Sequence, residues 1–283
     1  MPTSDNKPDR QDAPTAAAAP ETPDSHREAF SVTPPAVVPP VHAAASYGLP
    51  TVTREELTGH LIVIEGTDGS GRSTQIALLT EWLESQGFAV QTMGLRRSLL
   101  IAKDIDSLLA QNTVTRFTLA LMYATDFYDQ LENRIIPALR SGMVVLADRY
   151  LYTLIARAVV RGIDREYVHG IYDLALRPDI TFFLNVRPEI AFVREFRKSP
   201  AISYWEAGRD MALSNDLYES FIKYQTMIRK EFVALAKRHN FVTFNGEGSV
   251  RAVNADFRKR IAAYLGIRST RYQPSHALSH LWQ

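Results

Sequence analysis

The fold of this chain is decided by nine residues, Gly66-Thr67-Asp68-Gly69-Ser70-Gly71-Arg72-Ser73-Thr74. They follow the apolar run 61–64, typical of a strand buried in a parallel sheet, and they open a helical pattern over 72–86. They match G-x-x-x-x-G-K-[ST] except that arginine replaces lysine. Glycines let the backbone curl so that its N–H groups face a phosphate, and the helix N-terminus adds its dipole. We therefore expect a phosphate-binding loop.

Eight residues of the loop are expected to contact ATP. They are Gly66, Asp68, Gly69, Ser70, Gly71, Arg72, Ser73 and Thr74. Ser73 is also expected to hold Mg²⁺. Arg72 keeps the charge of the usual lysine, but its guanidinium is longer and planar, so the sequence predicts an effect on phosphoryl transfer rather than on binding. Arg72→Lys should raise turnover, unless the loop has adapted to arginine. The alternative is a glycine turn that binds no nucleotide.

Strand and helix patterns alternate beyond the loop. Strands are expected at 61–64, 88–92, 144–147, 180–186 and 241–244. Helices are expected at 72–86, 99–111, 115–141, 165–176, from Pro188 onward, and at 215–238 and 249–265. This order predicts an α/β fold of the P-loop NTPase type. Its doubly wound parallel sheet would have five strands and helices on both faces.

Composition divides the chain into three parts. Ten of the 15 prolines lie in residues 1–50, so we expect residues 1–55 to be a disordered leader rich in proline and alanine. Residues 56–267 form the expected folded domain, and residues 268–283 look like a loose basic tail. The sequence names no partner for the leader.

Composition also excludes several classes of protein. The chain has no cysteine, which excludes disulfides and thiolate chemistry and fits a cytoplasmic protein. The net charge of +1 gives no strong nucleic-acid signal, and no apolar run has the length of a membrane span. The dispersed histidines lack the spacing of a metal site.

Three further motifs follow the loop along the chain. They are Ile136-Pro137-Ala138-Leu139 before Gly142, Asp148-Arg149-Tyr150 after an apolar strand, and the stretch LRPDITFFLNV at 176–186. With the loop, they resemble the thymidylate kinase family from about residue 61 to residue 265. The resemblance implies a kinase that moves the γ-phosphoryl group of ATP to a nucleoside monophosphate, with Mg²⁺, in a homodimer.

The resemblance implies roles on the donor side. Asp148 would lie near Mg²⁺ and the phosphates, as a second metal-binding residue beside Ser73. The resemblance makes residues 56–267 a kinase domain with a lid at about 195–215. Arg194 and Arg209 would belong to this mobile lid over the donor phosphates. Asn245 precedes the last helix, where the family packs the donor adenine.

On the acceptor side the resemblance implies that Arg97 and Arg149 bind the acceptor phosphate and that Tyr123 stacks on its base. Tyr150 and Phe127 are assigned to the same substrate site. Phe127 stands where the family usually has an arginine that contacts the thymine edge, and Arg157 also departs from the family pattern. Base recognition is therefore expected to differ from that of the family.

The acceptor is expected to be a nucleotide. The residues after the second strand, 93–95 (MGL), include no carboxylate that could deprotonate a nucleoside hydroxyl. A pyrimidine deoxynucleotide similar to dTMP is the first hypothesis. The alternatives are a catalytically weak nucleotide-binding subunit with a regulatory or scaffold role, and a kinase for a modified or non-nucleotide acceptor.

Overall fold

The computed structural model describes residues 52–199 and 201–282. The predicted leader lies outside these residues, apart from its last few. Val52 already belongs to the main hydrophobic core, together with Leu57. The folded region therefore begins slightly before the predicted boundary at residue 55.

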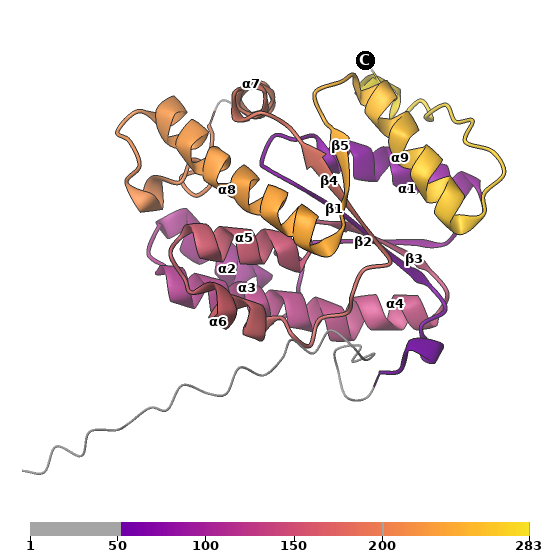
Figure 1. Cartoon of the computed structure of the whole chain (residues 1–283), viewed down its shortest axis with the longest axis horizontal. Helices are drawn as coiled ribbons and strands as arrows, with labels where there is room; N and C mark the ends of the chain where they lie inside the picture. The colour runs from indigo at the N-terminus through magenta and orange to yellow at the C-terminus, as the bar shows by residue number, and fades with distance from the viewer. Residues whose placement is uncertain (1–51, 200, 283) are drawn as a thin grey trace, which may run out of the picture. The chain divides into compact units, whose positions relative to one another are not determined.

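The centre of the fold is one sheet of five parallel strands in the order β2-β3-β1-β4-β5 (Figure 1). The strands are β1 (His60–Gly66), β2 (Val90–Gly94), β3 (Val144–Asp148), β4 (Ile180–Asn185) and β5 (Val242–Asn245). All five predicted strands are present. Because β1 is central, the loop after it lies at the middle of the carboxyl edge, where ligands bind in open α/β sheets.

Helices connect the strands. The α-helices are α1 (Arg72–Ser85), α2 (Ala102–Gln111), α3 (Arg116–Gln130), α4 (Ile136–Arg140), α5 (Leu151–Val160), α6 (Arg165–Ile171), α7 (Pro188–Lys198), α8 (Leu217–His239) and α9 (Val250–Leu265). Shorter turns are η1 (Arg54–Glu56), η2 (Leu131–Ile135), η3 (Arg209–Met211) and η4 (Ser279–Trp282). η2 is a π-helical turn that joins α3 to α4, so the predicted helix over 115–141 is one helical run.

Alternate residues of β1 face opposite layers. Leu61 and Val63 pack in the core that contains residues of α3, α4, α5 and α8. Ile62 and Ile64 pack in the core of α1 and α9. Figure 1 shows α1 and α9 on one side of the sheet and α3, α4 and α5 on the other. Two buried faces explain why β1 is a continuous apolar run rather than an alternating one.

Two expectations differ from the structure. Helix α5 was not predicted, because residues 151–158 are buried except for Arg157 and therefore lack a polar face to mark the helical period. The tail was expected to be loose, yet Tyr272 and Ser275 bond to Glu81 on α1. The tail lacks periodic apolar residues, so its packing left no signal in the sequence.

Candidate active site

The loop between β1 and α1 needs glycine at two positions. Gly69 and Gly71 have φ angles of 73° and 95°, a region that favours glycine. A β-carbon on Gly69 would also lie 2.2 Å from the carbonyl oxygen of Ala191 on α7. The backbone curl expected from the sequence is therefore present at the N-terminus of a 14-residue helix, where N–H groups and the helix dipole favour an anion.

The Arg72 side chain is fitted into this loop. Its Nη1 group donates to the carbonyl oxygens of Gly66 and Thr67, the first at 2.6 Å, and to Ser70 Oγ at 3.0 Å. Its Nε atom lies 2.9 Å from Asp148 Oδ1. The side chain is buried, so these acceptors replace the water that its charge has lost. The guanidinium thus extends from α1 back to the start of the loop.

Ser73 and Asp148 lie side by side. Ser73 Oγ donates to Asp148 Oδ2 at 2.8 Å. Burial opposes ionisation of Asp148, but the charges of Arg72 and Arg149 hold the pKa of its carboxyl below the ordinary value. Two adjacent oxygens, one of them anionic, fit Mg²⁺, which takes few protein ligands and completes its shell with water and phosphate. Residues 52–199 and 201–282 contain no cluster of three or more His, Asp or Glu side chains suited to a metal.

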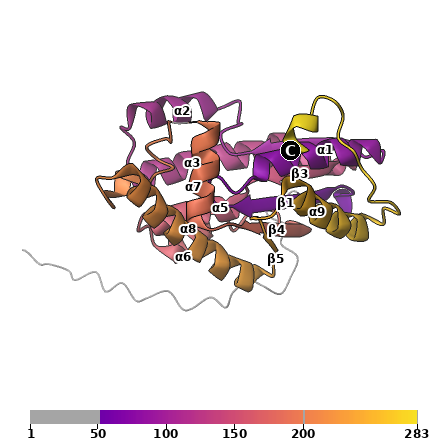
Figure 2. The same cartoon turned by 90° about the horizontal axis from the view of Figure 1, so that it is seen from above.

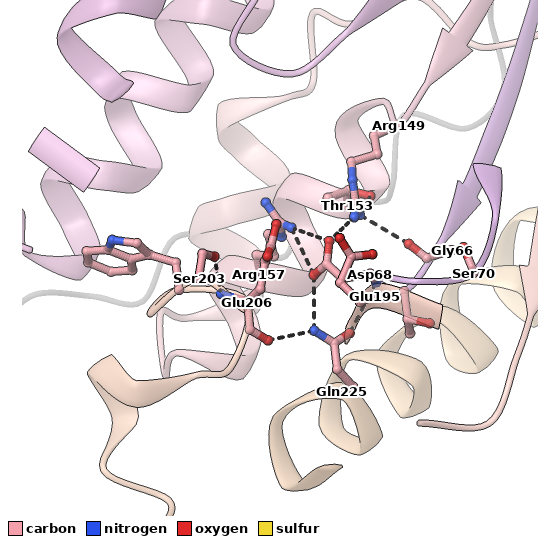
Figure 3. Close-up of polar contacts among 12 residues, drawn as sticks. Gly66, Asp68, Ser70, Arg149, Thr153, Arg157, Glu195, Ser203, Glu206 and Gln225 are labelled. Carbon is pink, nitrogen blue, oxygen red and sulfur yellow. Dashed lines mark hydrogen bonds and ion pairs between the residues drawn. The ribbon is translucent and has the colours of Figure 1, made fainter. Parts of the chain in front are cut away.

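Asp68 lies between two arginines (Figure 3). Its carboxylate bonds to Arg149 Nη2 and accepts from Arg157 Nη2 at 3.1 and 3.2 Å. Gln225 on α8 donates to Asp68 Oδ2 at 3.0 Å and to the carbonyl oxygen of Glu206 at 2.8 Å. Burial opposes ionisation of Asp68, but the charges of Arg149 and Arg157 hold its pKa well below the ordinary value. The cluster ties the loop to α5, α8 and the segment before η3.

Arg149 has a strained backbone, with φ at 76°. Glu65, at the end of β1, accepts from the backbone nitrogens of Tyr150 at 2.9 Å and Thr153 at 3.2 Å, which holds this turn. Burial raises the pKa of Glu65 to about 7. Burial and the charge of Arg72 lower the pKa of the Arg149 guanidinium to about 10. Backbone strain of this kind is typical of functional sites, where surrounding bonds enforce it.

One cavity of about 1110 Å³ runs along the carboxyl edge of the sheet. Its middle is lined by the loop, Asp148 and Arg149. Toward α9 it is lined by Gly246, Gly248, Val250, Val253 and Leu281, and toward α2 and α3 by Leu109, Leu119, Tyr123 and Trp205. Because β2 and β5 form opposite edges of the sheet, these two sets lie on opposite sides of the loop. The cavity therefore has room for ligands on both sides of the phosphate-binding loop.

The predicted acceptor-side residues divide into two groups. Arg97 and Tyr123 line the cavity. Phe127 and Tyr150 are only 1% and 0% exposed, and their rings pack against each other with centroids 5.0 Å apart. The structure places these two side chains in the core rather than at the cavity, because both lie on the inward faces of their elements. Their assigned contact with the substrate therefore does not fit this arrangement.

The predicted donor-side residues also divide. Arg194 lines the cavity and donates to the carbonyl oxygens of Gly246 at 2.8 Å and Ser70 at 3.4 Å. Arg209 instead donates to the carbonyl oxygen of Asn215 at 2.8 Å, within its own loop. Asn245 accepts from the backbone nitrogen of Glu247 at 3.0 Å and so shapes the turn after β5. Of these three predicted residues, the structure brings only Arg194 to the phosphate-binding loop.

Several cavity residues were not assigned to the site from the sequence. Arg157 departs from the family pattern and was considered as a replacement for the missing contact with the base edge, without being assigned to the site, and it lines the cavity. Arg161 also lines it, and its Nε atom lies 2.7 Å from Asp210 while its guanidinium covers the Trp205 ring at 5.7 Å. The signal that could have found both is their spacing of four residues, which places them on one face of a helix. That signal requires α5 to be recognised first.

Comparison with known proteins agrees with this geometry. The family model for thymidylate kinase matches residues 64–257. A probable thymidylate kinase 2 of Saccharolobus solfataricus is 39% identical over 210 residues, covering 74% of this chain and 98% of that protein. A probable thymidylate kinase of Pyrococcus abyssi is 35% identical over 136 residues, covering 46% and 66%. A thymidylate kinase of Brachyspira hyodysenteriae is 30% identical over 167 residues, covering 58% and 82%.

The chain belongs to the thymidylate kinase family. The resemblance seen in the sequence is confirmed, and so is the five-stranded α/β fold. Membership identifies a phosphotransferase, and it does not favour the alternative of a nucleotide-binding subunit without activity. Among residues 52–199 and 201–282, no helix combines the length and apolar character needed to span a bilayer.

Proposed function

We propose that the protein transfers the γ-phosphoryl group of ATP to a pyrimidine deoxynucleoside monophosphate similar to dTMP. The observation that carries this proposal is the Ser73–Asp148 pair beside the phosphate-binding loop, in a cavity that extends to Tyr123. The names of the relatives, all of them thymidylate kinases, supply the acceptor class.

The residues present are suited to phosphoryl transfer, which depends on positioning and on positive charge around the moving group. A monophosphate acceptor is already an anion, so no general base is needed. Loop N–H groups and Arg72 would bind the donor phosphates, while Arg194 would add charge from α7. Ser73 and Asp148 would hold Mg²⁺, which neutralises phosphate charge when bound.

The acceptor would lie toward α3. Arg97 would bind its phosphate, and the side chain lies across Gly94, where a β-carbon would come within 3.2 Å of Arg97 Nε. Tyr123 would contact the base. A guanidinium has five N–H donors, and the contacts of Arg157 with Asp68 use only Nη2, so Arg157 would supply hydrogen bonds to the base edge. In this proposal Arg157 makes the contact with the base edge that the family usually makes with an arginine at the position of Phe127.

Two further properties are proposed from family membership alone. A homodimer is expected, and sedimentation velocity of the purified chain would test it. A cytoplasmic location is expected as well, and fractionation of cells that express the chain would test it.

ADP release across a panel of acceptors tests the function. We expect Mg²⁺-dependent ADP release with dTMP and other pyrimidine deoxynucleotides, little with purine monophosphates, and none with the nucleoside thymidine. Thymidine is the matched control, since it differs from dTMP only in the phosphate that Arg97 would bind. Equal rates with thymidine and dTMP would contradict a nucleotide acceptor, and no release with any acceptor would contradict the kinase itself.

A further inference from the structure

Residues 268–282, which we name the strap, return from the end of α9 to α1 (Figure 2). Glu81 on α1 accepts from Tyr272 Oη at 2.9 Å and from both the backbone nitrogen and Oγ of Ser275 at 2.6 Å. The family match ends at residue 257, before this segment. The strap is therefore a feature that the proposed function has not used.

A second anchor holds the end of the strap. The Arg258 guanidinium on α9 lies over the rings of Tyr272 at 5.2 Å and Trp282 at 5.8 Å. The two rings also pack edge to face, with centroids 5.6 Å apart. Arg258 is buried, so its stacking on both rings takes place largely out of water, where a cation–π contact is strongest. Together the two anchors fix both ends of residues 272–282.

Fixing these ends brings two leucines to the candidate active site. Leu281 lines the main cavity together with Gly248, Val250 and Val253. Leu278 lines a smaller cavity of about 490 Å³ that also includes Ser73 and Asp148. The strap thus reaches the nucleotide site from the side of α1 and α9.

The chemistry of this end of the cavity is suited to a base. Gly246 and Gly248 present backbone there, while Val250, Val253 and Leu281 present apolar side chains, all next to the phosphate-binding loop. An aromatic base beside a bound triphosphate needs apolar surface against its faces and backbone groups at its edge. We propose that the strap is part of the donor-nucleotide site and that Leu281 contacts the donor base. This inference rests on the proposed function, since it requires ATP as a ligand.

Leu281 would act by direct contact, whereas Glu81 and Arg258 would be positioning residues. Loss of the Glu81 anchor should therefore weaken the binding of ATP, as should loss of the Leu281 side chain. Inorganic tripolyphosphate has no base or sugar, so its affinity for the loop should not depend on the strap. This difference separates contact with the base from a general disturbance of the loop.

Calorimetric titration of the full chain with MgATP tests the proposal without requiring turnover. We expect Leu281→Ala and Glu81→Ala to raise the Kd of ATP by about threefold to tenfold. Asp256→Ala is the matched control, because Asp256 is an exposed acid on α9 that lines neither cavity, and it should stay within about 1.5-fold of wild type. The Kd of magnesium tripolyphosphate should be the same in all four proteins.

Two results would overturn the proposal. The first is an unchanged Kd of ATP in both Leu281→Ala and Glu81→Ala, and the second is an equal loss of affinity for tripolyphosphate. If wild type bound neither ligand, the proposed function would fall together with this inference. If wild type bound ATP with the same Kd as both variants, the inference alone would fall.

Discussion

The phosphate-binding loop and the acceptor side of the cavity are built in different ways. The loop uses backbone from residues 66–74, shaped by two glycines with positive φ angles. The acceptor side uses side chains from separate elements, among them Tyr123 on α3, Arg157 on α5 and Trp205 before η3. Backbone groups change little on substitution, whereas a set of side chains changes with any one member. The fold can therefore keep donor binding while its acceptor choice varies.

The largest effect is expected at Asp148, which lies beside the loop and which we propose as a metal-binding residue. Asp148→Ala removes the carboxylate that contacts both Ser73 and Arg72, so turnover should fall by about 10²-fold to 10³-fold. Steady-state kinetics with ATP and dTMP would measure it, and circular dichroism would confirm the fold. Asp256→Ala, an exposed acid on α9, is the control. If Asp148→Ala kept turnover within twofold of wild type, the Ser73–Asp148 pair would not be the metal site.

Glu65 lies at the end of β1 and holds the turn at Arg149. A substitution of Glu65 should therefore alter the stability of the fold rather than the binding of one ligand. Its folded pKa of about 7 exceeds the ordinary value of 4.5, so the folded state keeps a proton that the unfolded state loses. Its contribution to stability therefore falls as pH rises from about 4.5 to 7. Glu65→Gln stays neutral at both pH values. Its free energy of unfolding, relative to that of wild type, should therefore be about 3 kcal/mol higher at pH 8 than at pH 4.

Urea unfolding at the two pH values would measure this difference. Wild type and Glu65→Gln should show the same change in unfolding free energy with pH only if the pKa of Glu65 is the same in the folded and unfolded protein. That result would contradict a protonated, buried carboxyl beneath the strained turn at Arg149.

Arg72 tests whether the loop has adapted to arginine. The sequence left open whether Arg72→Lys would raise or lower turnover. The fitted bonds of Arg72 to Gly66, Ser70 and Asp148 favour adaptation, since one ammonium nitrogen cannot reach both the loop and Asp148 as Nη1 and Nε do. We expect Arg72→Lys to lower kcat about tenfold with a smaller change in the KM of ATP. A faster lysine variant would show that arginine impairs the loop.

The smallest effect is expected in base selectivity. Arg157→Lys keeps the charge next to Asp68 but loses the planar fork, so the preference for dTMP over dCMP should fall by about threefold to tenfold. The ratio of kcat/KM values for the two acceptors measures it. Arg260→Lys, exposed on α9, is the control. An unchanged ratio would mean that another side chain reads the base.

These two regions also show what the sequence can predict. The loop between β1 and α1 and the five strands depend on short motifs and apolar runs, and the structure has them where the sequence predicts them. Ser73 and Asp148, which we assign to Mg²⁺, lie within hydrogen-bond distance of each other. Phe127 could not be placed, because its spacing from Tyr123 puts both on one helix without fixing which of them meets the cavity. Arg161 and Gln225 reach the site through packing of α5 and α8. The spacing of Arg161 from Arg157 becomes a signal only once α5 is recognised, and no local pattern marks Gln225. The predicted leader lies outside the described residues.

Product analysis tests the central claim, that this loop with Arg72 supports transfer to a nucleotide. The full chain would be incubated with ATP, dTMP and Mg²⁺, and the nucleotides separated by ion-exchange chromatography. We predict that dTDP and ADP appear in equal amounts and that Asp148→Ala forms neither at a comparable rate. ADP without dTDP, or bound ATP with no product at all, would contradict the claim.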